Sequence, residues 1–322
     1  SAHSDDGRIL RDNVYGTLDD DVWRRDFTVN ALYYDIKDFS VVDYVGGLDD
    51  LKLGVMRLIG DPEQRYREDP VRMLRAVRFA AKLGFRIDPD TESVMHELGY
   101  LLEDIPSARL FEEVMKLFLG GSAVSTFELL RHYNLFRYLF PLTEEALSHE
   151  EHNFPITFVL RALENTDKRL AENKPVTPAF LYAALLWEPM RQRSQVLLDE
   201  GASPLEASQI AGNQVTAEQV RATSLPKRFS FPMRDIWNLQ PRFERKRGKA
   251  PYRLLDNARF RAAYDFLLLR AEIGEADEAL AQWWTDFQVL NTAERDKMVE
   301  QQPATKKRRR RRRRKPSTDT ND

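Results

Sequence analysis

The sequence predicts an α+β protein in which a short β-rich segment is followed by helices. Apolar and polar residues alternate between residues 27 and 45, a pattern typical of strands. Beyond Gly60 the apolar residues recur at spacings of three and four, which is typical of amphipathic helices. Residues 301–322 show no apolar periodicity. These observations predict a small sheet, a long helical region and a disordered C-terminus.

The β-rich segment contains three predicted strands. They are expected at residues 27–36, 39–45 and 55–59. The first two are predicted to form a hairpin that Gly46 and Gly47 close. A sheet of two or three strands is marginal in water and leaves unpaired edges. We therefore expect these strands to need partners that this chain does not contain.

The first predicted helix begins at Asp69 and Pro70 and ends at Gly84. Asp69 is a favourable N-cap, and Pro70 suits the first helical position. We expect Pro189 to stop one of the later helices, and apolar periodicity fades from Asp286. The later helices are predicted at residues 91–102, 107–119, 123–133, 154–170, 178–187, 205–211, near 217–222, 233–239, 251–255 and 257–273.

The chain has 322 residues and no cysteine, which excludes disulfides, thiolate metal sites and cysteine catalysis. No apolar run approaches the roughly 20 residues needed to span a bilayer. The polar and acidic start, SAHSDDGRIL, is unlike a signal peptide. We therefore expect a cytoplasmic protein with no membrane partner. Because the chain starts at Ser1 rather than at Met, we also expect an upstream part.

The formal net charge of −2 conceals a strong division along the chain. Residues 1–220 carry 24 Lys and Arg against 37 Asp and Glu, whereas residues 221–261 carry 12 against 3. Residues 262–305 carry 3 against 9, and residues 306–322 carry 10 against 2. Basic blocks of this kind predict a polyanionic partner, because Lys and Arg displace counterions from phosphates.

The stretch WRRDFTVNA, residues 23–31, combines two guanidinium groups, a carboxylate and an amide. Arg24 and Arg25 can bind phosphates, since arginine presents five donors in a plane, and Asn30 adds an amide. Asp26 can serve a divalent metal ion, as phosphoryl transfer requires. The pattern also fits a surface Arg–Asp pair that caps a strand, and both interpretations stay open.

A second polar motif lies at the start of the first predicted helix. It contains Glu68, Asp69, Arg72 and Arg75. Asp69 and Arg72 are one helical turn apart, so they face the same side. A carboxylate beside a guanidinium can present an acceptor and a donor to the edge of a base. The alternative is that Asp69 is only an N-cap and Arg72 only its salt-bridge partner.

Residues 221–261 interleave their basic side chains with six aromatic rings. This composition indicates single-stranded RNA binding, although we expect most of the rings to be core. The basic tail, residues 306–315, holds seven arginines and three lysines, and we expect it to be disordered and to act electrostatically. The predicted RNA-binding residues are Lys227, Arg228, Arg242, Arg245, Lys246, Arg247, Lys249, Arg308, Arg310 and Arg312.

Three sequence motifs together resemble one family. RRDFTVNALYY, VVDYVGGLDDLKLGVMRLIG and REDPVRMLRAVRFAAKLGFRI occur in order within roughly residues 8–140 and resemble the class II nucleotidyltransferases. That family comprises CCA-adding enzymes and bacterial poly(A) polymerases. The segment from PKRFSFPMRDIWNLQPRF to FLLLRAE, and the polyarginine tail, look like the arginine-rich C-terminus of the poly(A) polymerases. CCA-adding enzymes generally lack both, so we favour the poly(A) polymerase branch.

The resemblance implies the organisation of the chain. It implies the remnant of a nucleotidyltransferase β-sheet head, followed by an all-helical neck, body and tail and a disordered basic C-terminus. We expect a partial head, a helical neck that reads the nucleobase, a helical body, an arginine-rich RNA-binding domain and a polybasic tail. The corresponding residues are 1–60, 61–140, 141–225, 226–290 and 291–322.

The resemblance also implies roles for individual residues. Asp26 becomes a catalytic and metal-binding carboxylate, and Asp69 and Arg72 become the template that reads the ATP base. The expected cofactor is Mg²⁺ at a two-metal site, and the expected partners are ATP and RNA 3′ ends. Nucleotide contacts are expected from Arg24, Arg25 and Asn30, with support for the triphosphate or the neck helix from Arg75 and Arg78.

The implied activity is the addition of AMP from ATP to RNA 3′ ends. One departure from the family is severe: the GGxVRD turn and the Asp-x-Asp pair that bind two magnesium ions are absent from this sequence. Residues 19–21 are three aspartates, but they lack the glycine turn, and we expect a solvated acidic turn there. We therefore expect this chain alone to be inactive. The alternatives are a CCA-adding enzyme and a non-catalytic RNA-binding module.

Overall fold

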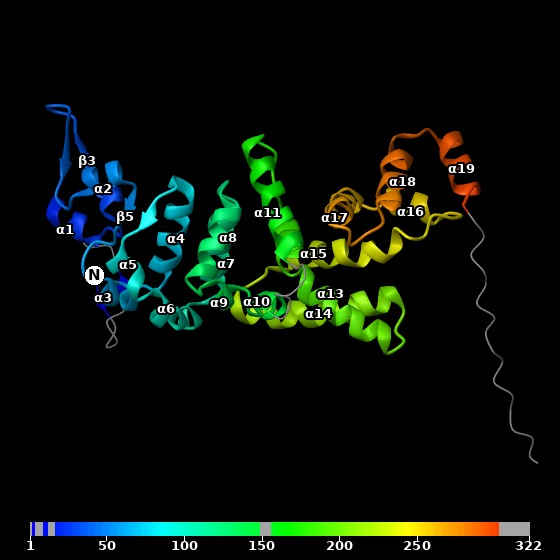
Figure 1. Cartoon of the computed structure of the whole chain (residues 1–322), viewed down its shortest axis with the longest axis horizontal. Helices are drawn as coiled ribbons and strands as arrows, with labels where there is room; N and C mark the ends of the chain where they lie inside the picture. The colour runs from blue at the N-terminus through cyan, green and yellow to red at the C-terminus, as the bar shows by residue number, and fades with distance from the viewer. Residues whose placement is uncertain (1, 4–8, 12–16, 149–155, 303–322) are drawn as a thin grey trace, which may run out of the picture.

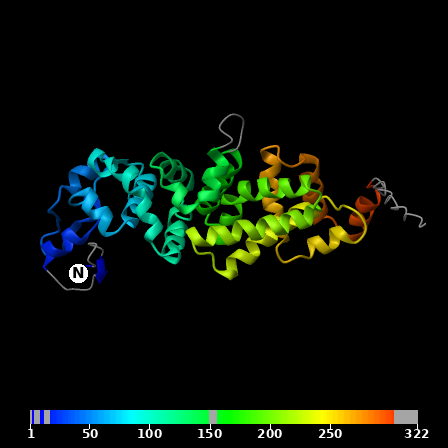
Figure 2. The ribbon, with the colours of Figure 1, turned by 90° about the horizontal axis from the view of Figure 1, so that it is seen from below.

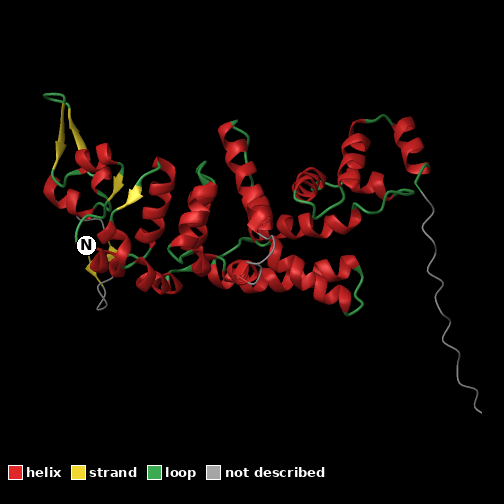
Figure 3. Cartoon of the chain, in the orientation of Figure 1, coloured by secondary structure: helices red, strands yellow, loops and turns green. Residues whose placement is uncertain are grey.

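The computed structural model shows an elongated array of helices, with the strands gathered at the N-terminal end (Figure 1). A view turned by 90° shows the same elongation (Figure 2). The structure describes residues 2–3, 9–11, 17–148 and 156–302. Helices dominate the described part and small sheets occupy one end (Figure 3), so the predicted α+β class is confirmed.

Six short strands form three two-stranded sheets in the described residues. The strands are β1 Ala2–His3, β2 Ile9–Arg11, β3 Leu32–Asp35, β4 Ser40–Asp43, β5 Val55–Met56 and β6 Arg86–Ile87. The pairs β1–β2 and β3–β4 are antiparallel, whereas β5 and β6 are parallel. The predicted hairpin is therefore present as β3–β4, but its turn lies at residues 36–39, and Gly46 and Gly47 instead begin α2.

The described helices account for most of the remaining chain. In the first half they are α1 Leu18–Arg24, η1 Thr28–Asn30, α2 Gly47–Leu53, α3 Pro62–Glu68, α4 Val71–Leu83, α5 Pro89–Ser93, α6 Met95–Leu98, η2 Gly99–Asp104, α7 Ser107–Phe118, α8 Ala123–His132, α9 Phe136–Leu139 and α10 Pro141–Ser148. In the second half they are α11 Ile156–Ala171, α12 Pro178–Leu185, α13 Trp187–Asp199, α14 Pro204–Ala222, α15 Lys227–Leu239, η3 Gln240–Arg242, α16 Ala250–Leu255, α17 Phe260–Glu272, α18 Glu278–Val289 and α19 Thr292–Glu300.

The first predicted strand is shorter than expected because tertiary contacts turn its N-terminal part into a 3₁₀ helix. The Thr28 hydroxyl donates to the buried Asp50 carboxylate at 2.7 Å. Gly47 lies beneath the same turn, where an added Cβ would stand 2.2 Å from the Thr28 carbonyl oxygen. A local alternation of apolar residues cannot reveal a contact that joins residues 22 positions apart.

The third predicted strand has its partner within the chain, which corrects two expectations. β5 pairs with β6, which follows α4, so the region beyond Gly60 is not wholly helical. The pairing also gives one of the three predicted strands a partner that we expected to be missing. The hairpin β3–β4, by contrast, keeps exposed apolar side chains at Tyr34, Ile36 and Phe39.

The helix around the second motif begins one residue later than predicted. Pro70 is the N-cap of α4, and Asp69 is the C-cap of α3, a helix that the sequence pattern did not predict. Asp69 still acts as a cap, because its Oδ1 accepts from the Val71 N–H at 3.2 Å. Gly84 ends α4 in the left-handed conformation at φ +66°, as predicted.

Two helices contradict the predicted boundaries farther along the chain. Pro189 does not stop the helices, because it lies in the first turn of α13, where a missing N–H costs nothing. α19 lies within the segment that we expected to be disordered from residue 291. Its N-terminus carries a capping box formed by Asn291 and Glu294, which fixes the first turn despite weak apolar periodicity. Residues 303–322 lie outside the described part.

Most buried apolar side chains form one large cluster and one smaller cluster at the C-terminal end, and a third cluster of Val22, Ala31 and Ile59 lies at the strand-bearing end. The large cluster runs from Phe27 to Leu269 and so crosses the expected head, neck and body. The smaller cluster is centred on Phe243, Trp284 and Phe287. The head and the helical region are therefore packed as one continuous body, although the division into five domains remains a prediction.

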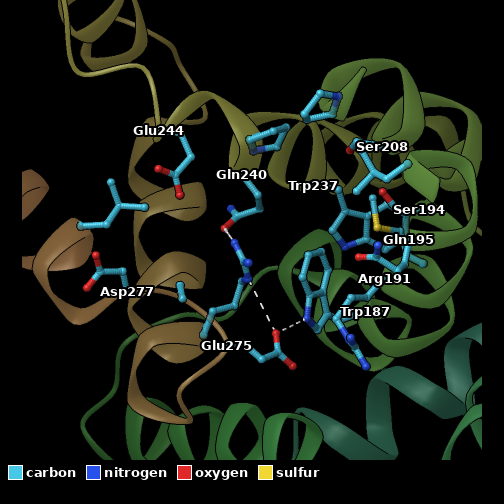
Figure 4. Close-up of a pocket in the computed structure, with 17 residues that line it drawn as sticks. Trp187, Arg191, Ser194, Gln195, Ser208, Trp237, Gln240, Glu244, Glu275 and Asp277 are labelled. Carbon is cyan, nitrogen blue, oxygen red and sulfur yellow. Dashed lines mark hydrogen bonds and ion pairs between the residues drawn. The ribbon is translucent and has the colours of Figure 1, made fainter. Parts of the chain in front are cut away.

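Four polar or aromatic side chains, Trp187, Gln240, Arg270 and Glu275, form a polar clasp between the large cluster and the C-terminal cluster. Trp187 Nε1 donates to Glu275 Oε2 at 2.8 Å, and Arg270 Nη1 donates to Gln240 Oε1 at 3.1 Å (Figure 4). The Arg270 guanidinium lies over the Trp187 ring at 5.0 Å, and its Nε is 3.7 Å from Glu275 Oε2. Burial raises the pKa of Glu275 and lowers the pKa of Arg270. The clasp lines a cavity of about 300 Å³ between α13, α17 and the start of α18.

The pKa of Glu275 predicts a pH-dependent stability. A carboxyl whose folded pKa is raised contributes stability that is complete below the ordinary value of 4.5 and is lost as pH rises through the folded pKa. Glu275→Gln keeps an acceptor for Trp187 but does not titrate. We expect the wild type to lose stability relative to this variant as pH rises across that window, because only the wild type must ionise a buried carboxyl. Urea unfolding at several pH values measures this loss of stability.

The exposed Glu272, whose nearest cation is Arg161 at 3.4 Å, provides the matched control. Glu272→Gln removes one exposed carboxylate at the end of α17 and so controls for the change in net charge. A parallel pH profile for wild type and Glu275→Gln would contradict the raised pKa of Glu275.

Candidate nucleotide site and nucleic-acid interface

Asp26 lies at the centre of the candidate site, between two arginines of α4. Its Oδ1 accepts from Arg72 Nε at 3.0 Å, and its Oδ2 is 2.6 Å from Arg75 Nε. The Asp26 side chain is 12% exposed and the Arg72 side chain 5% exposed. The expected surface Arg–Asp pair is therefore a shielded ion pair instead, and its arginines come from α4.

Local structure explains why these three side chains meet. Arg72 and Arg75 are three residues apart on α4, so they project from the same face. Asp26 follows α1, and its backbone carbonyl accepts a hydrogen bond from the Ile59 N–H at 2.8 Å. The neighbouring Thr28 N–H donates to the Arg57 carbonyl at 3.0 Å. These backbone bonds hold the Asp26 carboxylate against α4.

A second carboxylate and a third arginine complete the cluster. Arg72 Nη1 donates to Glu68 Oε2 at 3.1 Å and to the Arg65 carbonyl at 2.8 Å. Arg65 Nη1 donates to the same Glu68 oxygen at 2.9 Å, and its Nη2 donates to the Arg25 carbonyl at 2.9 Å. Burial, together with the charge of Arg72, lowers the pKa of Arg65. Three arginines thus face two carboxylates, which leaves one excess positive charge.

Arg78 extends the positive charge along α4. Its guanidinium lies over the Phe79 ring at 4.7 Å, and burial lowers its pKa. The negative charge of Glu113 of α7 opposes this lowering of the Arg78 pKa. Glu113 itself accepts a hydrogen bond from Lys116 Nζ at 2.7 Å, however, and is paired with that lysine. Arg78 therefore adds to the field that favours an anion near Asp26.

Arg25 braces the segment that carries the first motif. Its Nε donates to Tyr33 Oη at 3.0 Å and to Asp21 Oδ2 at 3.2 Å, and its Nη1 donates to the Asn30 carbonyl at 3.1 Å. The structure therefore brings Arg25 close to Asn30, through the Asn30 backbone. Arg24 is the last residue of α1, and its carbonyl lies 3.4 Å from Arg65 Nη2.

The three aspartates at residues 19–21 do not form the expected acidic turn, because they lie in α1. Asp20 forms a capping box with Thr17, which fixes the start of that helix and lowers the pKa of Asp20 through hydrogen bonds. Asp21 accepts from Tyr33 Oη at 2.6 Å and pairs with Arg25. Both side chains therefore serve local structure.

The side chains of Asp69 and Arg72 do not form the salt bridge that the alternative interpretation required, although the Arg72 N–H donates to the Asp69 carbonyl at 3.0 Å. Asp69 Oδ2 accepts from Arg109 Nη2 of α7 at 2.8 Å, whereas Arg72 turns toward Asp26 and Glu68. The pairing of Asp69 with Arg109 joins residues 40 positions apart, and no sequence spacing indicated it. Arg65 was also missed, although its position three residues before Glu68 on a helix is a usable signal.

The described residues do not by themselves form the expected two-metal magnesium site, whose main Asp-x-Asp pair this sequence lacks. No group of three or more His, Cys, Asp or Glu side chains within the described ranges could hold a metal ion. Both carboxylate oxygens of Asp26 already face guanidinium groups, which would have to be displaced before a cation could bind. The side chains around Asp26 therefore carry one excess positive charge, which favours an anion over a cation.

The predicted RNA-binding residues that the structure describes form two separate groups. Lys227 and Arg228 are exposed in the first turn of α15. The other group lies beyond the C-terminal end of α15, in η3 and the loop before α16. α15 has 13 residues and is therefore about 20 Å long, so the groups are that far apart. The second group consists of Arg242, Arg245, Lys246, Arg247 and Lys249. Arg308, Arg310 and Arg312 lie outside the described residues.

Most aromatic rings of the basic tract are core, as predicted. Trp237 and Phe243 are fully buried, and Phe260 is 6% exposed. Trp237 Nε1 donates to the Ala183 carbonyl at 3.1 Å, which shows that the ring serves the packing of α15 on α12. Phe231 is the exception at 52% exposed, with the Arg234 guanidinium 5.0 Å from its ring centre.

Three family models match successive parts of the chain. The poly(A) polymerase head domain matches residues 2–57, and the probable RNA and SrmB-binding site of polymerase A matches residues 84–147. The arginine-rich C-terminus of polymerase A matches residues 200–316. The order of the three matches is the order that the sequence motifs predicted.

Whole-chain comparisons decide the family. Poly(A) polymerase I of Haemophilus influenzae is 45% identical over 302 residues, which make up 93% of this chain and 67% of that protein. The chain belongs to the bacterial poly(A) polymerase family. Poly(A) polymerase I of Escherichia coli O6:H1 is 47% identical over 305 residues, 94% of this chain and 65% of that protein. The chain thus spans about two thirds of the length of these poly(A) polymerases.

CCA-adding enzymes are more distant relatives of this poly(A) polymerase family member. The CCA-adding enzyme of Leuconostoc mesenteroides is 43% identical over 123 residues, only 38% of this chain and 30% of that enzyme. The crystal structure of the Bacillus stearothermophilus CCA-adding enzyme in complex with CTP has a TM-score of 0.54 at 22% identity. It covers 91% of this chain and 67% of that one, and it shows a shared fold. No helix in the described part of the chain is long and apolar enough to cross a bilayer.

The burial of Arg72 predicts that its loss destabilises the fold. Arg72→Met leaves Asp26 and Glu68 with fewer hydrogen bonds in a shielded place, so we expect the free energy of unfolding to fall by about 2–3 kcal/mol. Arg67→Met is the matched control, because Arg67 lies on the adjacent helix α3 and forms an exposed pair with Glu63. The free energy of unfolding of Arg67→Met should differ little from that of the wild type. Equal urea midpoints for both variants would show that Arg72 is not a buried brace.

Proposed function

We propose that this chain functions in a polynucleotide adenylyltransferase, an enzyme that adds AMP from ATP to RNA 3′ ends. The identity of 45–47% with proteins named poly(A) polymerase I, over 93–94% of the chain, carries the proposal. In this reaction the RNA 3′-hydroxyl attacks the α-phosphate, a new phosphodiester bond forms, and the bond to the β-phosphate breaks as pyrophosphate leaves. ATP and RNA 3′ ends are the proposed partners.

The charge of the Asp26 cluster supports a role in holding the triphosphate. Arg65, Arg72 and Arg75 exceed the two neighbouring carboxylates by one charge, and a cation cluster in a shielded place attracts phosphate more strongly than one in water. Arg24, Arg25 and Asn30 precede or flank this cluster and are proposed to contact the ribose and the phosphates. Asp26 is proposed to be the carboxylate of this cluster that lies nearest to the reacting α-phosphate.

Reading of the adenine base is proposed for Asp69 and Arg72. Arg109 holds Asp69 at 2.8 Å, which leaves the other carboxylate oxygen bound only to the Val71 N–H at 3.2 Å. An acceptor in this position suits the amino group of adenine. Arg72 can reach a base only by exchanging one of its contacts with Asp26 or Glu68. Nucleotide binding and rearrangement of the ion pairs are therefore coupled in this proposal.

The complete gene product that contains this chain should add a long A tract to generic RNA in the presence of ATP. We expect this because the identity with poly(A) polymerases extends over nearly the whole chain, whereas that with CCA-adding enzymes stops at 38% of it. Gel analysis of labelled RNA incubated with ATP alone, or with CTP and ATP, measures the products. A tRNA lacking its 3′ end is the second substrate.

Repair of that tRNA by C, C and A, with no A tract on generic RNA, would show that the protein is a CCA-adding enzyme. RNA binding without any nucleotide addition would favour the non-catalytic binding module. Either result would contradict the proposed polyadenylation.

The basic tail is proposed to bind RNA phosphates without sequence preference. Deletion of residues 306–315 removes ten positive charges, so RNA binding should weaken and its dependence on salt should flatten. Each lost contact to single-stranded RNA lowers the slope of log K against log salt by about 0.7. Fluorescence anisotropy at several salt concentrations measures this slope. A variant with a Gly–Ser segment of equal length is the control for chain length, and an unchanged slope would exclude phosphate contacts by the tail.

A further inference from the structure

A second cavity, of about 270 Å³, lies where α11, α12, α15 and α17 pack against one another. This volume is near the lower end of the range for small-molecule sites, about 300–1,000 Å³, and suits a single nucleoside better than a large cofactor. The wall is mainly apolar. Its apolar side chains include Val176, Phe180, Pro232, Ile236 and Ala262.

The rim of the cavity is positively charged. Arg169, Arg259 and Arg261 line it against a single carboxylate, Asp265, so its net charge is 3 − 1 = +2. Arg261 Nε lies 3.1 Å from Asp265 Oδ1, and Arg169 Nη2 donates to the Pro175 carbonyl at 3.2 Å. The Arg261 side chain is 73% exposed, and Arg259 is exposed as well. Two guanidinium groups therefore stand at the mouth, where an anion can reach them.

Two helices begin at the same cavity. α12 starts at Pro178 behind its N-cap Thr177, and α17 starts at Phe260 behind its N-cap Arg259. The first turn of a helix carries a positive partial charge, although the Phe180 N–H already donates to Thr177 Oγ1 at 3.2 Å and the Phe260 N–H to the Asn257 carbonyl at 2.8 Å. Together with the arginines, these ends favour a phosphate group over a neutral or cationic ligand.

The wall offers an aromatic ring and polar groups for a base. Phe180 is half-buried and packs edge-on against Phe266, with ring centres 5.9 Å apart, which fixes the ring plane. Asp265 and Asn165 lie in the same lining, and burial raises the pKa of Asp265. Bases stack on such rings whatever their sequence, and polar groups beside the ring can hydrogen-bond to the base edge.

We propose that this cavity binds one nucleotide of an RNA strand, with its base against Phe180 and its phosphates at Arg259 and Arg261. The proposal rests on the proposed function, in which RNA is the substrate. A peptide without acidic or phosphorylated side chains would leave the two arginines and the two helix ends without a further anion, and an acidic peptide would offer Phe180 no base to stack on it, so RNA suits the site better. α17 lies beyond α11 from α4 along the molecule (Figure 1), so the bound nucleotide is upstream of the 3′ end.

Two variants of the whole chain test the ring and the charges separately. Phe180→Leu keeps the apolar volume but removes the stacking surface, so binding of a fluorescein-labelled oligoadenylate should weaken about five- to tenfold with an unchanged salt slope. Arg259→Gln with Arg261→Gln should weaken binding and lower the salt slope by about 1.4. Arg221→Gln with Arg253→Gln removes the same charge from the same basic tract outside the cavity and should have a smaller effect. Urea unfolding midpoints show whether each variant is folded.

Three outcomes would overturn the proposal. The first is that folded Phe180→Leu binds the oligoadenylate as the wild type does. The second is that both double variants weaken binding equally, which would reflect only the general charge of the tract. The third is that Phe180→Leu weakens the binding of free ATP but not of the oligoadenylate, in which case the cavity takes a mononucleotide. Failure of the complete gene product to add AMP would remove the proposed activity, yet a selective loss of RNA binding in Phe180→Leu would still support the cavity.

Discussion

The ion pairs between Asp26 and α4 are the constraint on which the rest of the structure depends. Arg72 is 4% exposed, and a guanidinium at this depth is tolerated only when acceptors replace its lost hydration. Asp26, Glu68 and the Arg65 carbonyl supply them. Because Asp26 belongs to the strand-bearing end and Arg72 to the first long helix, this requirement ties the two together. The apolar cluster that runs from Phe27 to Leu269 then extends the attachment along the molecule.

The same pairing connects structure with chemistry. A site that handles a triphosphate needs positive charge in a shielded place, yet uncompensated guanidinium groups there would destabilise the fold. In the proposed function, three arginines facing two carboxylates would meet both needs, because the cluster carries only one excess charge and would receive an anion by exchanging partners. Asp69 takes no part in this exchange of partners, because its carboxylate is paired with Arg109 of α7.

Local sequence patterns correctly predicted those structural features that depend on residues close together in the chain. The hairpin β3–β4, the end of α4 at Gly84 and the core positions of Trp237 and Phe243 follow from alternation, glycine conformation and helical spacing. Some misses, such as α3, α19 and Pro189 in the first turn of α13, are local, whereas the misses in the strands and the site come from long-range contacts. The 3₁₀ helix at residues 28–30 depends on Asp50, and the parallel strand β6 depends on β5. In the site, the burial of Arg72 and its turn away from Asp69 result from the distant Asp26, which spacing on one helix cannot show.

For the proposed RNA partner, the distribution of charge along the chain indicates in which direction a strand would lie. Residues 1–220, which contain the Asp26 cluster, carry 37 acidic against 24 basic residues, so a polyanionic strand gains little from lying along that part. Residues 221–261 carry 12 basic against 3 acidic residues, and the two basic groups at the ends of α15 lie about 20 Å apart. A strand held there gains most of its binding energy far from Asp26. Only its end then needs to enter the acidic part, where local arginine clusters rather than the overall field must receive it.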